Sequence, residues 1–217
     1  MQNPISLIRK SIIILQRLGI KNCLPFFYKR VFSVENFYLL KRNLNEPINE
    51  IKFRITYSLV KIKEGDWNEI SETLRSADVA TQKEFLRRFF FYTAGFNNCY
   101  VLKNKNGEIA CILWLIYPSE NENLRKYYKS DIFLLKQNEV LLENLFTLPK
   151  FRGFGFSPVL TSELLKLAKN EGYLTAIAII YSMKDRITSM NDMMNIGFKI
   201  SKLIKEYRLL GLLWRVK

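Results

Sequence analysis

The sequence predicts an α+β protein in which helices and strands surround one mixed sheet. Three observations predict this fold class. The length of 217 residues suits one domain with an appendage. The apolar share of 48% and the charged share of 25% are those of a folded globular chain. From residue 51 onward, strand-like alternation and helix-like spacing follow one another, separated by turn residues.

The first 45 residues form the appendage in this interpretation. Residues 1–42 carry eight basic side chains against one acidic side chain, Glu35. Positions at helical spacing in this segment are Ile5, Ile8, Ile12, Leu15 and Gly19. We therefore expect a basic amphipathic helical arm over residues 1–45 and a separate domain over residues 51–217.

The first half of the domain begins with a strand in which apolar and polar residues alternate. The expected elements are a strand over 51–56, helices over 66–74 and 81–90, and strands over 99–103 and 108–117. Asp66 and Thr81 are the expected N-caps of the two helices. Asn106-Gly107 predicts a hairpin turn, since both residues tolerate positive φ angles.

The second half of the domain alternates in the same way. The expected elements are a loop with a short helix over 118–137, a strand over 139–147, a helix over 158–170, a strand over 174–181, a helix over 185–195, and strands over 198–203 and 206–216. Gly172 marks a helix end. The strand over 174–181 is almost entirely apolar, which predicts cover on both faces.

The composition excludes several kinds of catalytic site. The chain has no histidine, which removes Ser-His and Cys-His nucleophile pairs and histidine metal sites. Its three cysteines, Cys23, Cys99 and Cys111, are widely spaced in apolar surroundings, which fits neither a disulfide framework nor a zinc cluster. We expect reduced thiols, no metal and a cytoplasmic protein.

Charge and hydropathy limit the partners. No apolar stretch is long enough to span a membrane, and Arg17 interrupts the apolar residues 11–16 too early for a signal peptide. No basic stripe with interleaved aromatics predicts nucleic-acid binding. Residues 1–32 leave two interpretations open: a helix packed on the domain, or contact with an anionic membrane at its inner face. The net charge of +14 also suits a phosphate-bearing ligand.

The most informative segment is Phe146–Ser157, between a predicted strand and a predicted helix. Pro149 ends the strand, and Gly153 and Gly155 let the backbone turn with its N–H groups outward. Those amides open into a helix N-terminus and predict a site for a diphosphate. The segment lacks the Gly-Lys-Ser/Thr ending of a nucleotide-triphosphate loop.

This segment resembles the loop of the GNAT superfamily, the acyl-CoA-dependent N-acetyltransferases. Their loop has Arg or Gln, two residues, Gly, one residue, then Gly or Ala. The sequence Arg152-Gly153-Phe154-Gly155-Phe156-Ser157 matches it except for Ser157 at the last position. Further along, Arg186, Ser189, Met193 and Gly197-Phe198 stand at the offsets where the family often has Asn, Ser, Tyr and Gly-Phe. The resemblance covers about residues 51–216.

The resemblance implies a GNAT-like fold and acetyl-CoA as acyl donor. It implies a bulged strand that separates from its neighbour, so that a wedge opens between residues 145–148 and 179–182. A backbone N–H at Leu148 or Phe146 would polarise the thioester carbonyl. Arg186 or Lys184 would reach the phosphates. The implied cofactor contacts are Phe146, Thr147, Leu148, Arg152, Gly153, Phe154, Gly155, Phe156, Ser157, Arg186 and Ser189.

The resemblance also suggests the groups that move protons. Glu143, on the strand that leads to the wedge, is the candidate base for the amine. Met193 stands where many relatives have the tyrosine that protonates the leaving thiolate, and a thioether cannot donate a proton. Tyr181 is the candidate substitute. Each has a structural alternative: Glu143 as a strand carboxylate with a basic partner, and Tyr181 as a core tyrosine.

Three functions remain open at this stage. The first is an N-acyltransferase that transfers acetyl from acetyl-CoA to a small-molecule amine, such as an amino sugar or an amino-acid derivative. The second is a non-catalytic acyl-CoA-binding regulatory or scaffold module, motivated by Met193 and Ser157. The third is a membrane-surface enzyme of cell-envelope biosynthesis, motivated by the basic arm. The acceptor, the acyl length and the oligomeric state do not follow from the sequence.

Overall fold

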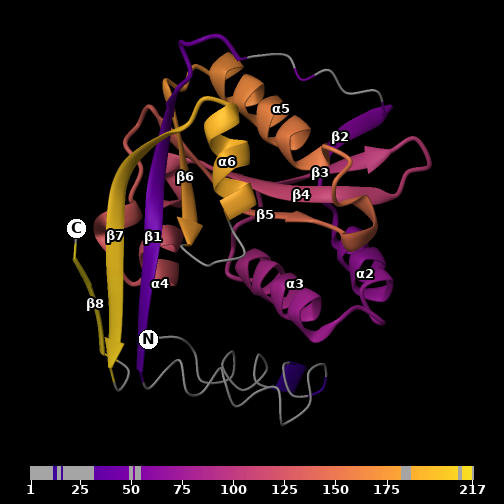
Figure 1. The fold of residues 1–217 in the computed structure, drawn as a ribbon, viewed down its shortest axis with the longest axis horizontal. Coiled ribbons are helices and arrows are strands. Elements are labelled where there is room, and N and C mark those ends of the chain that lie inside the picture. Colours follow the sequence, from indigo (N-terminus) through magenta and orange to yellow (C-terminus); the bar gives the residue numbers. More distant parts are fainter. Residues whose placement is uncertain are drawn as a thin grey trace.

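The structure, a computed structural model, is built around one eight-stranded sheet. It describes residues 12–13, 16, 32–48, 51, 55–181, 187–209 and 212–216. The strand order is β2-β3-β4-β5-β6-β1-β7-β8, and neighbours are antiparallel except for β5 and β6, which are parallel. The predicted α+β class with a mixed sheet is confirmed (Figure 1).

Strands and helices are interspersed along the described part of the chain. The strands are β1 (Phe32–Asn43), β2 (Tyr57–Lys61), β3 (Cys99–Asn104), β4 (Ile109–Ile116), β5 (Glu139–Thr147), β6 (Thr175–Tyr181), β7 (Lys199–Leu209) and β8 (Leu212–Val216). The α-helices are α2 (Glu64–Thr73), α3 (Val79–Tyr92), α4 (Asn121–Tyr128), α5 (Phe156–Asn170) and α6 (Ile187–Asn195). Single 3₁₀ turns lie at Pro118–Glu120, Asp131–Phe133 and Pro149–Phe151.

Two hydrophobic cores lie on the two faces of the sheet. One contains buried residues of α2, α3 and α4, and the other contains buried residues of α5 and α6. Figure 1 shows α5 and α6 together on one side of the sheet. Every residue of β4 is buried, because this central strand is covered on both faces. The site described below lies beside it, on β5 and β6.

The expected helical arm through residue 45 is wrong for residues 32–43, which form β1. This strand lies inside the sheet, antiparallel to β6 on one side and to β7 on the other. Phe37, for example, is paired with Tyr181 and with Ile204. The cause is tertiary, since partners from the end of the chain complete the hydrogen bonding of β1. Ile12, Ile13 and Gln16 are helical, and the rest of residues 1–31 lies outside the described residues.

Three other boundaries differ from the prediction. The first strand is β2 rather than residues 51–56; Ile55 and Thr56 precede it, and residues 52–54 lie outside the described part. The N-cap of α3 is Asp78, whose Oδ1 accepts the Thr81 N–H at 2.9 Å, so the helix begins before Thr81. The N-cap of α2 is Lys63 rather than Asp66. Asp66 lies in the first turn of the helix, where its carboxylate accepts the Lys63 N–H.

The break between the last two strands also lies at a different position from the predicted one. β7 continues through residues 204 and 205, where the prediction placed a turn, because Ile204 is fully buried in the core under the sheet. The remaining predicted elements are confirmed within a few residues. These include the hairpin, where Gly107 has a φ of 80°, and the β5 strand, whose observed bounds equal the predicted ones.

Candidate functional site

The two central parallel strands separate at their carboxyl ends. β5 and β6 are paired from Glu139 and Thr175 to Leu142 and Ala178. Both strands continue, to Thr147 and Tyr181, but the pairing between them does not. The expected wedge between these strands is therefore present. It opens beside the turn that leads into α5 (Figure 1).

A β-bulge in β5 accounts for this separation. Trp114 is paired with Glu143 and Ile112 with Phe146, so Leu113 faces two residues of β5. One of them, Asn144, has a φ of 62°. Asparagine is among the few residues other than glycine that adopt this left-handed conformation readily. The extra residue bends β5 and turns it away from its former partner.

The backbone orientation in β5 corrects the expected donor to the thioester carbonyl. The Leu148 N–H donates to the Ala110 carbonyl at 3.0 Å, so it is committed to β4. The register gives Phe146, paired with Ile112, the same orientation. The peptide groups that face the wedge are those of Leu145 and Thr147. The Leu145 carbonyl accepts from Arg88 at 2.8 Å, and the Thr147 carbonyl accepts from Arg152 at 3.2 Å.

The predicted phosphate loop leads directly into α5. Gly153 has a φ of 81°, and Gly155, the N-cap of the helix, has a φ of 83°. The first N–H groups of an α-helix have no partner within the helix, and Pro158 in the first turn needs none. A Cβ atom placed on Gly153 would meet no other atom within 4 Å, so the loop surface is open. The loop thus offers amide donors and the positive end of a helix dipole to an anion.

Arg152 is exposed at the edge of this loop. Its Nε atom bonds the Thr147 carbonyl, and its guanidinium lies 5.9 Å from the centre of the Phe146 ring. The side chain is thereby held along the end of β5. A guanidinium presents five donors, so the bond from Nε to the Thr147 carbonyl leaves others that could reach an anion at the loop.

The two candidate proton-transfer residues lie close together beside the wedge. Glu143 is buried, and Tyr181 contacts the core on the same face of the sheet. Burial raises the pKa of Tyr181, and the negative charge of Glu143 raises it further, against the opposing charge of Arg87. Burial likewise raises the pKa of Tyr128, which forms a side-chain hydrogen bond with Glu143. Both hydroxyls therefore keep their protons at neutral pH.

Two arginines of α3 complete the site, and the sequence analysis missed both. Arg88 is buried, ion-paired with Glu84, and lies 5.1 Å from the centre of the Phe146 ring. The Arg87 guanidinium lies 5.6 Å from the centre of the Tyr181 ring. A signal was present in the sequence. Arg88 follows Phe85 by three residues and so shares the buried face of the helix.

Some of the remaining residues singled out in the sequence lie outside the described part of the structure, and one lies in the core. Arg186 and Lys184 lie outside the described residues, and so does the side chain of Ser189. Met193 is buried in the core on the α5 side of the sheet, whereas Tyr181 contacts the core on the other side. Met193 therefore packs as an ordinary core residue.

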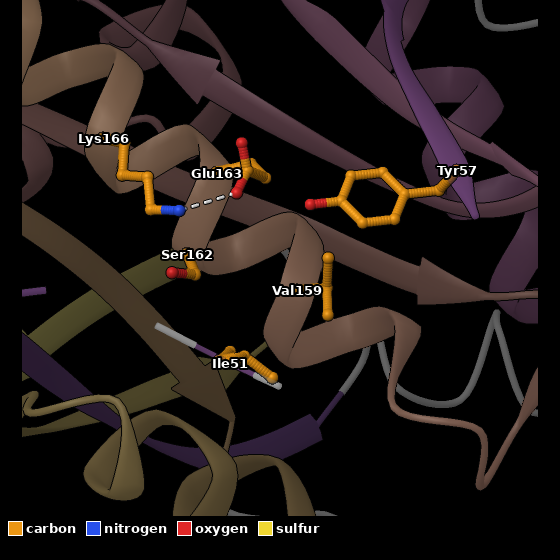
Figure 2. Close-up of a pocket in the computed structure, with 6 residues that line it drawn as sticks. All are labelled: Ile51, Tyr57, Val159, Ser162, Glu163 and Lys166. Atoms are coloured by element: carbon orange, nitrogen blue, oxygen red, sulfur yellow. Dashed lines mark hydrogen bonds and ion pairs between the residues drawn. The ribbon is translucent and has the colours of Figure 1, made fainter. Parts of the chain in front are cut away.

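A separate pocket of about 210 Å³ lies further along α5 (Figure 2). Its lining residues are Ile51, Tyr57, Val159, Ser162, Glu163 and Lys166. Glu163 and Lys166 form an ion pair of 2.9 Å, and the Tyr57 hydroxyl points toward Glu163. None of these residues was predicted for the cofactor or for catalysis.

Two further searches concern the described residues only. Within them, no group of three or more histidine, cysteine or carboxylate side chains could hold a metal ion. Within the same ranges, no helix is both long and apolar enough to cross a membrane.

Solved structures with this arrangement of elements share little sequence with the chain. A GCN5-related N-acetyltransferase from Sphaerobacter thermophilus aligns with a TM-score of 0.55 at 12% identity, over 92% of this chain and 57% of that one. A GNAT-family acetyltransferase from Colwellia psychrerythraea aligns with a TM-score of 0.55 at 12% identity, over 96% and 75%. The glucosamine N-acetyltransferase region of a fungal multidomain GH3 β-N-acetylglucosaminidase also reaches 0.55 at 12% identity, over 90% and 23%.

The chain thus spans 57% and 23% of the length of two of these proteins. No protein-family model and no curated protein sequence matches it. The likeness is one of architecture, and it includes the mixed sheet and the helices on its two faces. The chain has the fold of the GNAT superfamily of N-acetyltransferases.

Proposed function

We propose that this protein is an N-acyltransferase that uses acetyl-CoA as donor and a small-molecule amine as acceptor. One observation carries the proposal: β5 and β6 separate beside the open amides at the start of α5. A diphosphate bound at that helix would direct its attached chain into the gap, where backbone donors are not used by the sheet. The fold supports the same reaction class.

The donor would be held by the loop residues. The diphosphate fits the amides at Gly153–Ser157, and Arg152 adds a positive charge that is already oriented by the Thr147 carbonyl. Acetyl-CoA supplies the activated thioester. The N–H groups of Leu145 and Thr147 face the gap and would stabilise the negative charge that develops on the thioester oxygen. Arg88 holds this part of β5 through the Leu145 carbonyl.

Glu143 and Tyr181 would carry the protons. An amine must lose a proton before or during attack, and Glu143 is the carboxylate nearest to the end of the wedge on β5. Tyr181 carries its hydroxyl proton at neutral pH, because its pKa lies above the ordinary value of 10.0, so it would be the proton donor to the leaving thiolate. The buried Tyr128 orients Glu143 through their hydrogen bond.

The acceptor remains defined only by class. An amino sugar or an amino-acid derivative would present the required amine. One structural neighbour is described as a glucosamine N-acetyltransferase, which supports including amino sugars among the amines tested. No nucleic-acid partner is proposed.

The test combines binding with turnover. Isothermal calorimetry measures acetyl-CoA binding, and a thiol-release assay measures CoA formation with amino sugars and amino-acid amides. We expect saturable binding and amine-dependent release of CoA. Absence of acetyl-CoA binding would contradict the proposal.

A second candidate is an acyl-CoA-binding module without turnover. The observation that favours it is Met193, which is buried in the core at the sequence position where relatives have a tyrosine acid. Under this alternative, acetyl-CoA binds but no amine releases CoA, and Glu143→Gln changes neither result.

A further inference from the structure

The outer part of the sheet, formed by β1, β7 and β8, has two very different faces. Directly opposite residues in neighbouring strands share a face. On one face, Phe37 and Ile204 enter the core, and Glu206 forms a buried ion pair with Arg215 at 2.5 Å. The rest of the protein therefore covers this face at these four residues.

The opposite face, here called the outer face, presents apolar side chains to solvent. The register places them in rows across the three strands. The outer face comprises Phe32, Val34, Leu203, Tyr207, Leu209, Leu212, Trp214 and Val216. Leu212 is 71% exposed, Phe32 55% and Trp214 45%. An apolar surface of this extent on a folded chain marks a docking site rather than scattered exposure.

The charged residue that the structure describes on the outer face is basic. Lys205 is exposed on this face, in the row between Asn36 and Val216. The carboxylates of Glu35 and Glu206, paired across β1 and β7, lie on the opposite face. The described residues of the outer face include no carboxylate. Residues 1–31, which lead into Phe32, contain six basic residues and no acidic one.

The side-chain types also point to a lipid surface. Tyr207 and Trp214 stack with ring centres 5.7 Å apart. Rigid aromatics with aliphatic neighbours and lysine are the residue types that settle at the boundary between water and acyl chains. A second copy of this chain is disfavoured, because face-to-face contact would oppose two Lys205 side chains and two chains of net charge +14.

We infer that the outer face docks on an anionic lipid bilayer, with the aromatic and aliphatic rows at the acyl-chain boundary and Lys205 toward the headgroups. This inference extends the membrane interpretation of the basic arm to a described surface. It does not depend on acyl transfer, and its test measures no catalysis.

The full chain supplies its own probe. Its other two tryptophans, Trp67 and Trp114, are buried, so a change in fluorescence on vesicle addition reports Trp214. We expect binding to vesicles of phosphatidylcholine with phosphatidylglycerol, a blue shift of the emission, and quenching by lipids brominated on their acyl chains. Vesicles of phosphatidylcholine alone should bind more weakly.

Matched substitutions test the surface itself. Leu212→Asp and Val216→Asp on β8 should each weaken vesicle binding by about tenfold, since each removes an exposed apolar contact. Val60→Asp is the control, because Val60 is also a partly exposed valine of an edge strand, β2, at the other end of the sheet. It should bind vesicles as the wild type does. Thermal melting checks that each variant is folded.

Several outcomes would overturn the inference. One is no binding to either vesicle. Another is binding that the β8 substitutions and Val60→Asp alter equally, or binding without quenching by brominated acyl chains. A dimer in sedimentation velocity that Leu212→Asp dissociates, with no vesicle binding, would assign the outer face to a second copy instead. The quenching experiment needs no variant, so an unfolded variant leaves the inference testable.

Discussion

Glu143 occupies an environment suited to a base that is buried but not isolated. Tyr128 forms a hydrogen bond with Glu143. The charge of Glu143 also raises the pKa of Arg87 and the pKa of Tyr181, so both side chains lie within electrostatic range of it. A carboxylate in apolar surroundings would otherwise be costly to keep charged. The hydrogen bond from Tyr128 and the positive charge of Arg87 therefore stabilise the Glu143 carboxylate beside the wedge.

At this position, Glu143→Gln should lower kcat/KM for the amine by about 10²-fold, the usual contribution of a general base. The affinity for acetyl-CoA in calorimetry should stay unchanged. Glu139→Gln on the same strand is the matched control, since Glu139 is paired with Lys41 away from the wedge. Equal rates for both variants would exclude Glu143 as the base.

Arg88 is the residue that joins α3 to the bulge. It contacts Glu84 and the Leu145 carbonyl at once, which a lysine with a single ammonium group cannot reproduce. Arg88→Lys should lower the free energy of unfolding by about 1–3 kcal/mol and weaken acetyl-CoA binding. Urea denaturation and calorimetry measure the two effects.

Arg75→Lys provides the comparison for Arg88→Lys. Arg75 and Glu72 form an exposed ion pair on the surface, and such pairs contribute little. The free energy of unfolding should change by less than about 0.5 kcal/mol. If Arg88→Lys lowers the free energy of unfolding as little as Arg75→Lys does, the bulge does not depend on Arg88.

Among the elements, α5 permits a test within one helix. Gly155 precedes it with a φ of 83°, and Gly172 follows it with a φ of 88°. Valine at either position costs roughly 1–3 kcal/mol of backbone strain. Gly155→Val alone should weaken acetyl-CoA binding, by at least about tenfold, because it also blocks backbone approach to the diphosphate. Equal affinities for the two variants in calorimetry would argue against the loop as the binding site.

The ion pair between Lys41 of β1 and Glu139 of β5 links elements across β6, with a separation of 2.6 Å. Burial alone would raise the pKa of Glu139, but Lys41 and the Lys136 amide outweigh it and lower the pKa below its ordinary value of 4.5. A lowered folded-state pKa stabilises the protein above the unfolded-state pKa. That stability is lost as the pH falls through the folded-state pKa.

It follows that Glu139→Gln should cost about 1 kcal/mol of unfolding free energy at pH 7, allowing for the partial exposure of Lys41. The cost should shrink as the pH falls below 4.5. Urea denaturation at pH 7 and pH 3 measures the difference. A cost that does not depend on pH would mean that the ion pair contributes nothing.

Elements with local signals could be predicted from the sequence, and elements defined by distant partners could not. The β5 strand, the glycine loop and α5 carry their own apolar patterns and turn residues, so their order and conformation could be predicted, whereas phosphate binding by the loop stays a prediction. β1 could not be recognised, because its central position depends on β6 and β7. For the same reason the role of Arg88 was missed: its contact with Leu145 joins segments that are far apart in the chain.

For the molecule as a whole, the folded unit includes β1, from Phe32 onward, and does not begin at residue 51. Deleting residues 1–31 should preserve a cooperative thermal transition, since β1 remains. Deleting residues 1–45 should abolish it, because β7 and β8 then lose their connection to β6. Circular dichroism during heating distinguishes the two. A cooperative transition in the shorter protein would show that β1 is dispensable.

The position of β1 also affects how the chain is made. Among the described strands, β1 leaves the ribosome first, yet its two neighbours, β6 and β7, follow only after β2, β3, β4 and β5 have been made. Its backbone groups and its apolar residues must wait without their final partners in the meantime. The slow step of maturation should therefore be the insertion of β1 between β6 and β7, and nascent chains should need protection until that step is complete.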